Sequence, residues 1–125
     1  MLLDFKSDKP IFIQLAESIE DDILKGVFEE ETQIPSTTEM AVTLRINPAT
    51  SAKGVGLLVD ESIIYKKRGV GMFVATGAKK IIGDKRRKSF FQDYVLAMLT
   101  EARKLGISQD ELITMIERSD KDERD

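Results

Sequence analysis

Apolar residues at regular four-residue spacing predict a helix near the start of the chain. They are Ile11, Leu15, Ile19 and Ile23. Residues four apart lie on one face of an α-helix. Proline suits the first turn of a helix, and glycine suits the position just past its end. The sequence therefore predicts a helix from Pro10 to about Lys25, with Gly26 as its C-terminal cap.

Three consecutive acids, Glu20, Asp21 and Asp22, lie within this predicted helix. Adjacent residues of a helix point in different directions, so these carboxylates make a poor metal site. They fall mostly on the outer face of the helix, where we expect water to solvate them.

The stretch from Ser36 to Val74 predicts two short helices followed by a hairpin. Ser36 and Glu39 have the spacing of a capping box. Asn47-Pro48 starts the second helix, because Asn caps a helix and Pro is preset for its first position. β-branched and aromatic residues at 62–67 and 72–75 then flank a turn at 68–71, which is typical of a hairpin. This order describes a winged helix-turn-helix, a fold that places its second helix in the DNA major groove.

The chain resembles, over its first three-fifths, the DNA-binding domain of the GntR family of bacterial transcription regulators, and most closely the family's small YtrA-like branch. The matching residues before the second helix are Pro10-Ile11-Phe12, Gln14-Leu15, Gly26, Pro35-Ser36, Glu39, Ala41 and Leu44. Those of the second helix and the wing are Asn47-Pro48, Thr50, Lys53, Leu58, Arg68-Gly69, Gly71 and Phe73-Val74.

The resemblance implies sequence-specific binding to double-stranded DNA, by a homodimer that represses transcription from a palindromic operator. The expected DNA-binding residues of the two helices are Ser36, Thr38, Arg45, Asn47, Ala49, Thr50 and Lys53. Those of the wing are Lys66, Lys67, Arg68 and Gly69. Hydroxyls bond base edges or phosphate, and lysine prefers phosphate or guanine. The alternative is that Thr50 serves the fold, that Lys53 is a solvated surface lysine, and that the wing charges keep an edge strand soluble.

Three features depart from the family pattern. Thr38 stands where an arginine is frequent, and the predicted loop Val27–Ile34 lacks the usual glycine turn. Gly54 and Gly56 lie inside the second helix, where each costs about 1 kcal/mol relative to alanine. The two glycines permit the close approach of another helix or of the DNA backbone, and the residue types alone favour neither.

Residues 77–125 are predicted to form a basic linker followed by a helical pair. Residues 79–88 contain six basic side chains and one acidic side chain. Lys85–Lys88 are suited to gripping flanking phosphates, to anchoring on an anionic membrane surface, or to forming a solvated helical turn. Beyond them an apolar stripe ends near Leu105-Gly106, and Ser108 with Glu111 predicts a further capped helix.

Two helices cannot bury a stripe of this width between themselves, and in the YtrA-like branch this part serves dimerisation. The expected dimer interface is Phe90, Phe91, Tyr94, Val95, Met98, Leu99, Leu112 and Ile116. A pocket lined by Phe and Met for a small-molecule effector is the alternative use of these side chains. The predicted fold class is α+β and mostly helical, with a winged helix-turn-helix at residues 1–76 and a two-helix dimerisation element within 77–125.

Composition narrows the function further. A chain of 125 residues forms one domain, or a small domain with an appendage. It contains no cysteine and no histidine, the residues most used for nucleophilic catalysis, acid–base chemistry and zinc binding. We therefore expect neither an enzyme nor a cofactor or metal site. With no apolar run of membrane-spanning length and no signal-peptide layout, we expect a cytoplasmic protein without a membrane partner.

The net charge of −3 weakens the case for nucleic acid without removing it. Residues 36–75 carry five basic and three acidic side chains. Surface potentials act over a Debye length of about 8–10 Å, so a local basic face matters more than the total charge. The competing hypothesis is a protein-interaction module on a winged-helix scaffold that has lost specific DNA reading.

Overall fold

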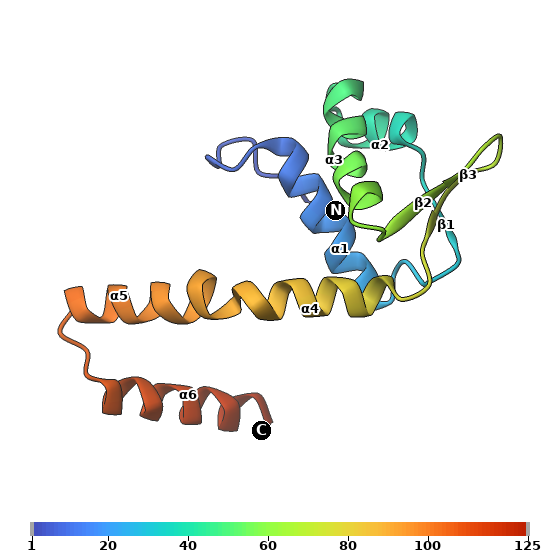
Figure 1. The fold of residues 1–125 in the computed structure, drawn as a ribbon. Helices are drawn as coiled ribbons and strands as arrows, with labels where there is room; N and C mark the ends of the chain where they lie inside the picture. Colours follow the sequence, from blue (N-terminus) through green and yellow to red (C-terminus); the bar gives the residue numbers. More distant parts are fainter. Residues whose placement is uncertain (1, 125) are drawn as a thin grey trace. The chain divides into compact units, whose positions relative to one another are not determined.

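The computed structural model describes the backbone of residues 2–124 and the side chains of residues 2–120. They form two compact units, divided between Lys85 and Arg86. The N-terminal unit contains α1 (Ile11–Lys25), β1 (Gln33–Ile34), α2 (Thr37–Leu44), α3 (Pro48–Asp60), β2 (Ile64–Lys67), β3 (Gly71–Val74) and the start of α4 (Ala78–Phe90) (Figure 1). The C-terminal unit contains the end of α4, the π-helical stretch η1 (Phe91–Leu96), α5 (Ala97–Lys104) and α6 (Gln109–Arg124). The predicted mostly helical α+β fold with a winged helix-turn-helix is confirmed.

The core of the N-terminal unit is built from α1, α3, the sheet and the start of α4. Its buried side chains include Leu15, Ile19, Ile23, Ile34, Val55, Leu58, Ile64, Met72, Val74, Ala78 and Ile82. The last two belong to α4, so this unit extends beyond residue 76, where the sequence places the division.

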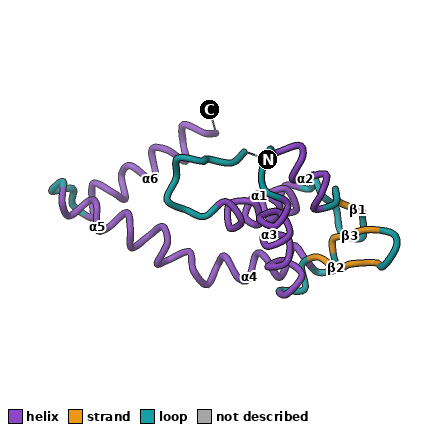
Figure 2. The backbone as a smooth tube through the Cα atoms, turned by 90° about the horizontal axis from the view of Figure 1, so that it is seen from above, coloured by secondary structure: helices purple, strands orange, loops and turns teal. Residues whose placement is uncertain are grey.

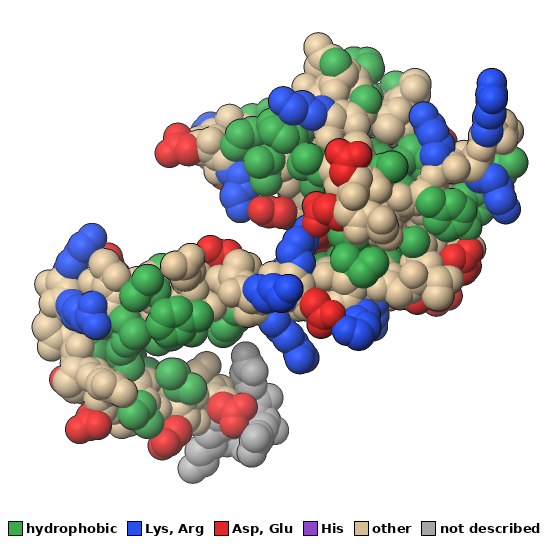
Figure 3. Space-filling model, in the orientation of Figure 1, with side chains coloured by type: hydrophobic (Ala, Val, Ile, Leu, Met, Phe, Trp, Pro, Cys, Tyr) green, Lys and Arg blue, Asp and Glu red, His purple; other side chains and the backbone are tan. Residues whose placement is uncertain are grey.

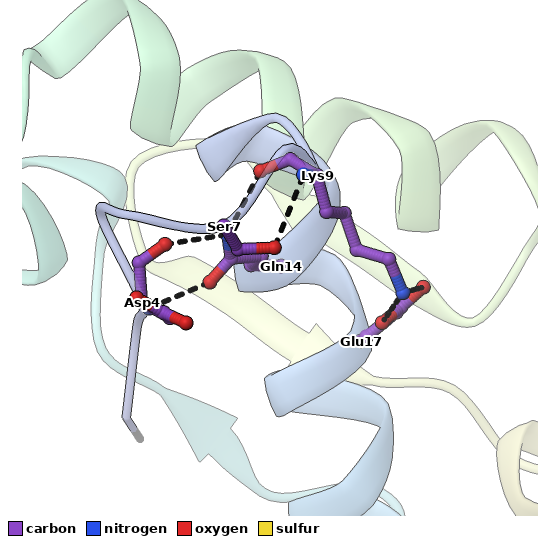
Figure 4. A network of polar contacts seen from close by, with 5 residues as sticks. All are labelled: Asp4, Ser7, Lys9, Gln14 and Glu17. Carbon is purple, nitrogen blue, oxygen red and sulfur yellow. Dashed lines mark hydrogen bonds and ion pairs between the residues drawn. The ribbon is translucent and has the colours of Figure 1, made fainter.

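The arm before α1 is hydrogen-bonded to that helix (Figure 4). The side-chain amide of Gln14 accepts from the backbone N–H of Asp4 at 2.7 Å, and donates to the carbonyl oxygens of Asp4 at 2.9 Å and Lys9 at 2.8 Å. Lys9 also forms an exposed ion pair with Glu17 at 3.0 Å. A single glutamine side chain thus fixes the start of the described chain against the first turn of α1.

Both predicted helix caps of the helix-turn-helix are confirmed. The Ser36 hydroxyl accepts from the backbone N–H of Glu39 at 3.1 Å, and the Glu39 carboxylate accepts from the N–H of Ser36 at 3.2 Å. Asn47 accepts from the N–H of Ala49 at 2.8 Å, with Pro48 at the first helical position. These contacts are local in sequence, and they satisfy N–H groups that a helix start would leave unpaired.

A hydrogen bond between side chain and backbone joins α2 to α3. Ser51 on α3 is fully buried, and its hydroxyl donates to the carbonyl oxygen of Thr37 on α2 at 2.7 Å. Between the helices Arg45 adopts the left-handed conformation, with φ 55°. The Ser51 hydrogen bond ties α3 to the start of α2, and the turn between them requires a left-handed conformation that is costly for a residue other than glycine.

α3 packs closely on α1 at Gly54. A Cβ atom at Gly54 would lie 2.7 Å from the carbonyl oxygen of Phe12 and 3.1 Å from Cδ2 of Leu15. At Gly56 the same position has no neighbour within 4 Å. The two helix glycines therefore differ, since Gly54 serves helix packing whereas Gly56 faces open space.

The sheet has three antiparallel strands in the order β1-β3-β2, and the β2–β3 loop extends beyond them (Figure 2). Gln33 pairs with Phe73 and Ile34 with Met72. The predicted hairpin is confirmed, because β2 pairs with β3 from Ile64–Val74 to Lys67–Gly71. The prediction of a loop through Ile34 was wrong, because Gln33 and Ile34 form the third strand. A two-residue strand is too short to show an alternating pattern. Its partner β3 also lies far along the chain, so no local signal predicts the pairing.

The carboxylate of Glu30 caps the start of α4. It accepts from the backbone N–H groups of Gly77 and Lys79, each at 3.0 Å. These hydrogen bonds hold the pKa of Glu30 below its usual value of 4.5, and the one from Gly77 has the larger effect. An acid at a helix N-terminus also meets the positive end of the helix dipole.

The neighbouring Glu31 joins the β3–α4 connection to β2. Its carboxylate accepts from the Thr76 hydroxyl at 2.6 Å, the Thr76 N–H at 3.0 Å and the Tyr65 hydroxyl at 2.7 Å. The hydrogen bond from the Thr76 hydroxyl, then that from Tyr65, lowers the pKa of Glu31. The loop acids therefore hold the fold together at the base of the wing.

Glu20 corrects the expectation of a solvated acidic face on α1. It is 3% exposed and forms an ion pair with Lys85 of α4. Lys85 also pairs with Glu61, at the end of α3, at 2.6 Å. Burial favours the neutral form of Lys85, but its hydrogen bonds to Glu20 and Glu61 outweigh burial and raise its pKa. Lys85 therefore joins α4 to α1 and α3. The sequence suggested phosphate contacts, membrane anchoring or a solvated turn for Lys85–Lys88, and did not predict this structural role.

In the C-terminal unit the described chain is helical from α4 through η1 to α5. Four residues of this stretch are spaced four apart: Phe90, Tyr94, Met98 and Ala102. Because an α-helix has about 3.6 residues per turn, residues at this spacing shift gradually around a regular α-helix. The i→i+5 bonds of a π-helix hold more residues in each turn. η1 therefore reduces this shift over Phe91–Leu96.

The loop after α5 leads to α6 through the predicted cap, since the Ser108 hydroxyl accepts from the N–H of Glu111 at 3.1 Å. Ala102 and Leu112 are the buried hydrophobic residues among the described side chains of this unit. No helix within residues 2–124 has both the length and the apolar character needed to cross a bilayer.

The two helix glycines should respond oppositely to alanine. Gly54→Ala should lower the free energy of unfolding by about 1–3 kcal/mol, because its Cβ overpacks the contact with α1. Gly56→Ala should raise it by about 0.5–1 kcal/mol, because a helical glycine loses more backbone entropy than alanine. Urea denaturation followed by circular dichroism measures both values. Equal effects of the two changes would contradict the assignment of Gly54 to packing.

Stability should fall at acid pH because Glu30 and Glu31 titrate lower in the folded chain. Below pH 4.5 the unfolded chain binds more protons at these groups than the folded chain, so their contribution is complete above 4.5 and is lost as pH falls through the lowered pKa values. Glu30→Gln with Glu31→Gln should reduce stability at neutral pH and flatten its decline with acid in denaturant titrations. Glu29→Gln, in the same loop, is the matched control and should preserve the wild-type profile.

Candidate nucleic-acid interface

α3 presents two chemically different sides. The buried side consists of Ser51, Gly54, Val55 and Leu58. The exposed side of its first two turns carries Ala49, Ala52 and Lys53. Small side chains leave the helix backbone accessible, and alanine can contact a thymine methyl group in the major groove.

The other residues expected to bind DNA in the helix-turn-helix surround the start of α3. Arg45 and Asn47 are exposed in the turn, Thr50 is half-buried, and Thr38 is exposed on α2. The side-chain oxygen Oδ1 of Asn47 accepts from the N–H of Ala49 and so caps α3. The hydroxyl of Ser36 caps α2, so it already has a structural use.

Lys53 is held against α1 rather than extending freely into water. Its Nζ lies 4.1 Å from the centroid of the Phe12 ring. An ammonium this close to the face of an aromatic ring is attracted by the ring quadrupole. The side chain stays exposed, so the ammonium is available to a partner on its uncovered side.

The wing carries the predicted cations at its end. Lys66, Lys67 and Arg68 are exposed, and Gly69 has φ 77° in a turn closed by a 2.9 Å hydrogen bond from the N–H of Val70 to the Lys67 carbonyl oxygen. On the face shown in Figure 3, Lys and Arg side chains project from the wing, whereas Asp and Glu side chains gather lower on the N-terminal unit.

Three side-chain contacts brace the wing. The Gln33 side-chain amide donates to the carbonyl oxygen of Val70 at 3.0 Å. Gly71 has φ 145°, and a Cβ there would lie 2.3 Å from Nε2 of Gln33, so glycine is required for this contact. On the same side of the sheet Tyr65 stacks on Phe73 with centroids 5.6 Å apart, and the Lys67 Nζ lies 5.2 Å from the Phe73 centroid.

The start of α3 and the end of the wing lie along one edge of the N-terminal unit (Figure 1). The first N–H groups of a helix carry a partial positive charge, which favours phosphate. This edge therefore combines the helix dipole, exposed lysine and arginine, and small side chains. Such a surface is suited to contacts with phosphates and base edges.

Sequence reasoning missed Ala52, Gln33 and Phe12 as parts of this surface or its support. Ala52 lies one turn before Gly56 on the open side of α3, so helical periodicity alone points to it. Phe12 was among the residues that carry the family resemblance, but no role in DNA binding was predicted for it. No sequence signal places Gln33 under the wing, since the contact joins residues 37 positions apart.

Of the eight residues expected in the dimer interface, five are exposed: Phe90, Phe91, Tyr94, Met98 and Ile116. Val95 and Leu99 are half-buried. Leu112 is 8% exposed, so it belongs to the interior of the C-terminal unit.

Comparison with known proteins finds relatives among bacterial transcription regulators. No family model matches the chain. A solved GntR-family structure from Bacteroides thetaiotaomicron is 38% identical, covers 90% of this chain and 98% of its own, and has a TM-score of 0.73. The transcriptional repressor YtrA from Bacillus subtilis is 26% identical over 88% of this chain and 84% of its own. The DNA-binding domain of AraR, solved in complex with operator ORX1, is 27% identical over 60% of this chain and 93% of its own, with a TM-score of 0.54.

The fold and these relatives define a DNA-binding transcription regulator with a winged helix-turn-helix. More particularly, the chain belongs to the GntR family and is YtrA-like, as the sequence resemblance implied.

Proposed function

We propose that this chain binds an operator in double-stranded DNA as a homodimer in the cytoplasm and represses transcription there. The observation that carries the proposal is the shared edge formed by the start of α3 and the wing. A helix with small exposed side chains can enter the major groove, while the adjacent cations contact the backbone on either side.

In this proposal, residues at the start of α3 recognise the DNA sequence. Asn47 and Thr50 supply groups that bond base edges, and Ala49 and Ala52 supply apolar contacts for thymine methyls. Arg45, in the turn before α3, is able to bond guanine or phosphate. Thr38 is shorter than the arginine frequent in the family, so less of the specificity falls to α2.

The second copy is proposed to bind through the C-terminal unit. Phe90, Phe91 and Tyr94 are 55%, 57% and 67% exposed, and Ile116 is 55% exposed. Burial of apolar area contributes about 25 cal/mol per Å², which favours association of two such stripes. Two linked half-site contacts raise affinity by about 10²–10⁴ without any new contact to DNA.

The wing should contribute to the salt dependence of binding. Lys67→Ala with Arg68→Ala should weaken binding to all duplexes and reduce the slope of log affinity against log salt, by about 0.9 for each phosphate that the wing no longer neutralises. Fluorescence anisotropy over a salt series measures the slope. Lys79→Ala with Lys25→Ala removes the same number of cations elsewhere in the N-terminal unit and serves as the control. An unchanged slope in the wing variant would remove the wing from the interface.

Selection of bound sites from random duplex DNA at physiological salt tests the proposed function directly. The full chain should enrich a palindrome with half-sites about 34–36 Å apart, or a multiple of that distance. Phe91→Ser with Tyr94→Ser should sediment as a monomer and enrich only a half-site, whereas Val27→Ser, at an equally exposed apolar residue of the N-terminal unit, should behave as wild type. Enrichment of no sequence would favour the protein-interaction module instead.

A further inference from the structure

We propose that Phe12 is a positioning residue for DNA binding: its ring holds the Lys53 ammonium beside α3, where the ammonium contacts a DNA phosphate. The inference rests on the proposed function and adds a residue that makes no DNA contact of its own. It follows from the 4.1 Å separation between the Lys53 Nζ and the centroid of the Phe12 ring.

The contact leaves the lysine usable. Phe12 is half-buried and Lys53 is exposed, so the lysine stays open to solvent while its ammonium contacts the ring. A free lysine samples many rotamers and loses that freedom when it binds a phosphate. A lysine already held in place loses less, so the ring should strengthen binding even though it remains outside the DNA interface.

Gly54 makes this arrangement possible. It follows Lys53 directly and allows α3 to approach the Phe12 backbone so closely that a Cβ would lie 2.7 Å from the Phe12 carbonyl oxygen. At this helix separation the lysine side chain reaches across to the ring on α1. The glycine inside the recognition helix and the cation–π contact are therefore two parts of one arrangement.

The chemistry favours phosphate over a base as the partner of Lys53. Lysine is a compact point charge that binds phosphate without a fixed geometry. The ring draws the ammonium towards α1, whereas the residues proposed to face base edges lie at the start of α3. Lys53 should therefore contribute affinity and salt dependence without changing which sequence is selected.

A double-mutant cycle on the full chain tests this inference, with the duplex enriched by selection and an unrelated duplex as probes. Lys53→Gln should weaken binding to both duplexes and reduce the salt slope by about 0.9. Phe12→Leu should weaken both about two- to fivefold, the range expected for one exposed cation–π contact. In the Lys53→Gln background Phe12→Leu should cost nothing further, and Phe12→Tyr, which retains the ring, should preserve wild-type affinity.

Phe28→Leu makes the same change at another partly buried aromatic residue and should show no coupling to Lys53. In the free protein the Lys53 Hε protons should be shifted upfield by the ring, and Phe12→Leu should abolish the shift. An equal loss from Phe12→Leu in both backgrounds, or no upfield shift in the wild type, would overturn the inference and leave the proposed function standing. Failure of the wild-type chain to bind either duplex would overturn both.

Discussion

The packing of α3 on α1 at Gly54 is the contact on which the rest of the DNA-binding surface depends. Because Gly54 has no side chain, the two helices approach until the Phe12 carbonyl oxygen occupies the space that a Cβ would fill. The buried Ser51 hydroxyl then ties α3 to the start of α2. Together these contacts set how far the first turns of α3 extend from the unit and which side chains they expose.

The acidic total charge and a basic binding surface are compatible because many of the acids have structural partners. Glu20 and Glu61 pair with Lys85, and Glu30 and Glu31 accept hydrogen bonds at the β3–α4 connection. These carboxylates hold α4 to the core instead of opposing DNA. The wing cations remain exposed, so the local charge at the binding edge differs in sign from the net charge.

Features that depend on neighbours in sequence could be predicted, and those that depend on distant partners could not. The caps at Ser36, Asn47 and Ser108 are set by residues two or three positions away, and all three were predicted correctly. β1 was missed because its pairing with β3 spans the whole helix-turn-helix. Glu20 was placed in water because the lysine that pairs with it lies 65 positions later.

The candidate site follows the same division. The family resemblance pointed to Ala49 and Lys53, which are exposed on α3, and to the wing cations, which are exposed as well. The supports of those groups, Phe12 beneath Lys53 and Gln33 beneath the wing, come from elements folded in from elsewhere. Their residue types carry no signal of such a role.

The central claim, that the exposed side of α3 enters the major groove, can be tested by disulfide trapping. The chain contains no cysteine, so Ala52→Cys provides a single thiol on that side. It should form a disulfide in high yield with a thiol tethered to a base in the major groove of the selected duplex, whereas Lys25→Cys, at the far end of α1, should not. Equal yields from the two positions, or no trapping from Ala52→Cys at any base of the site, would contradict the claim.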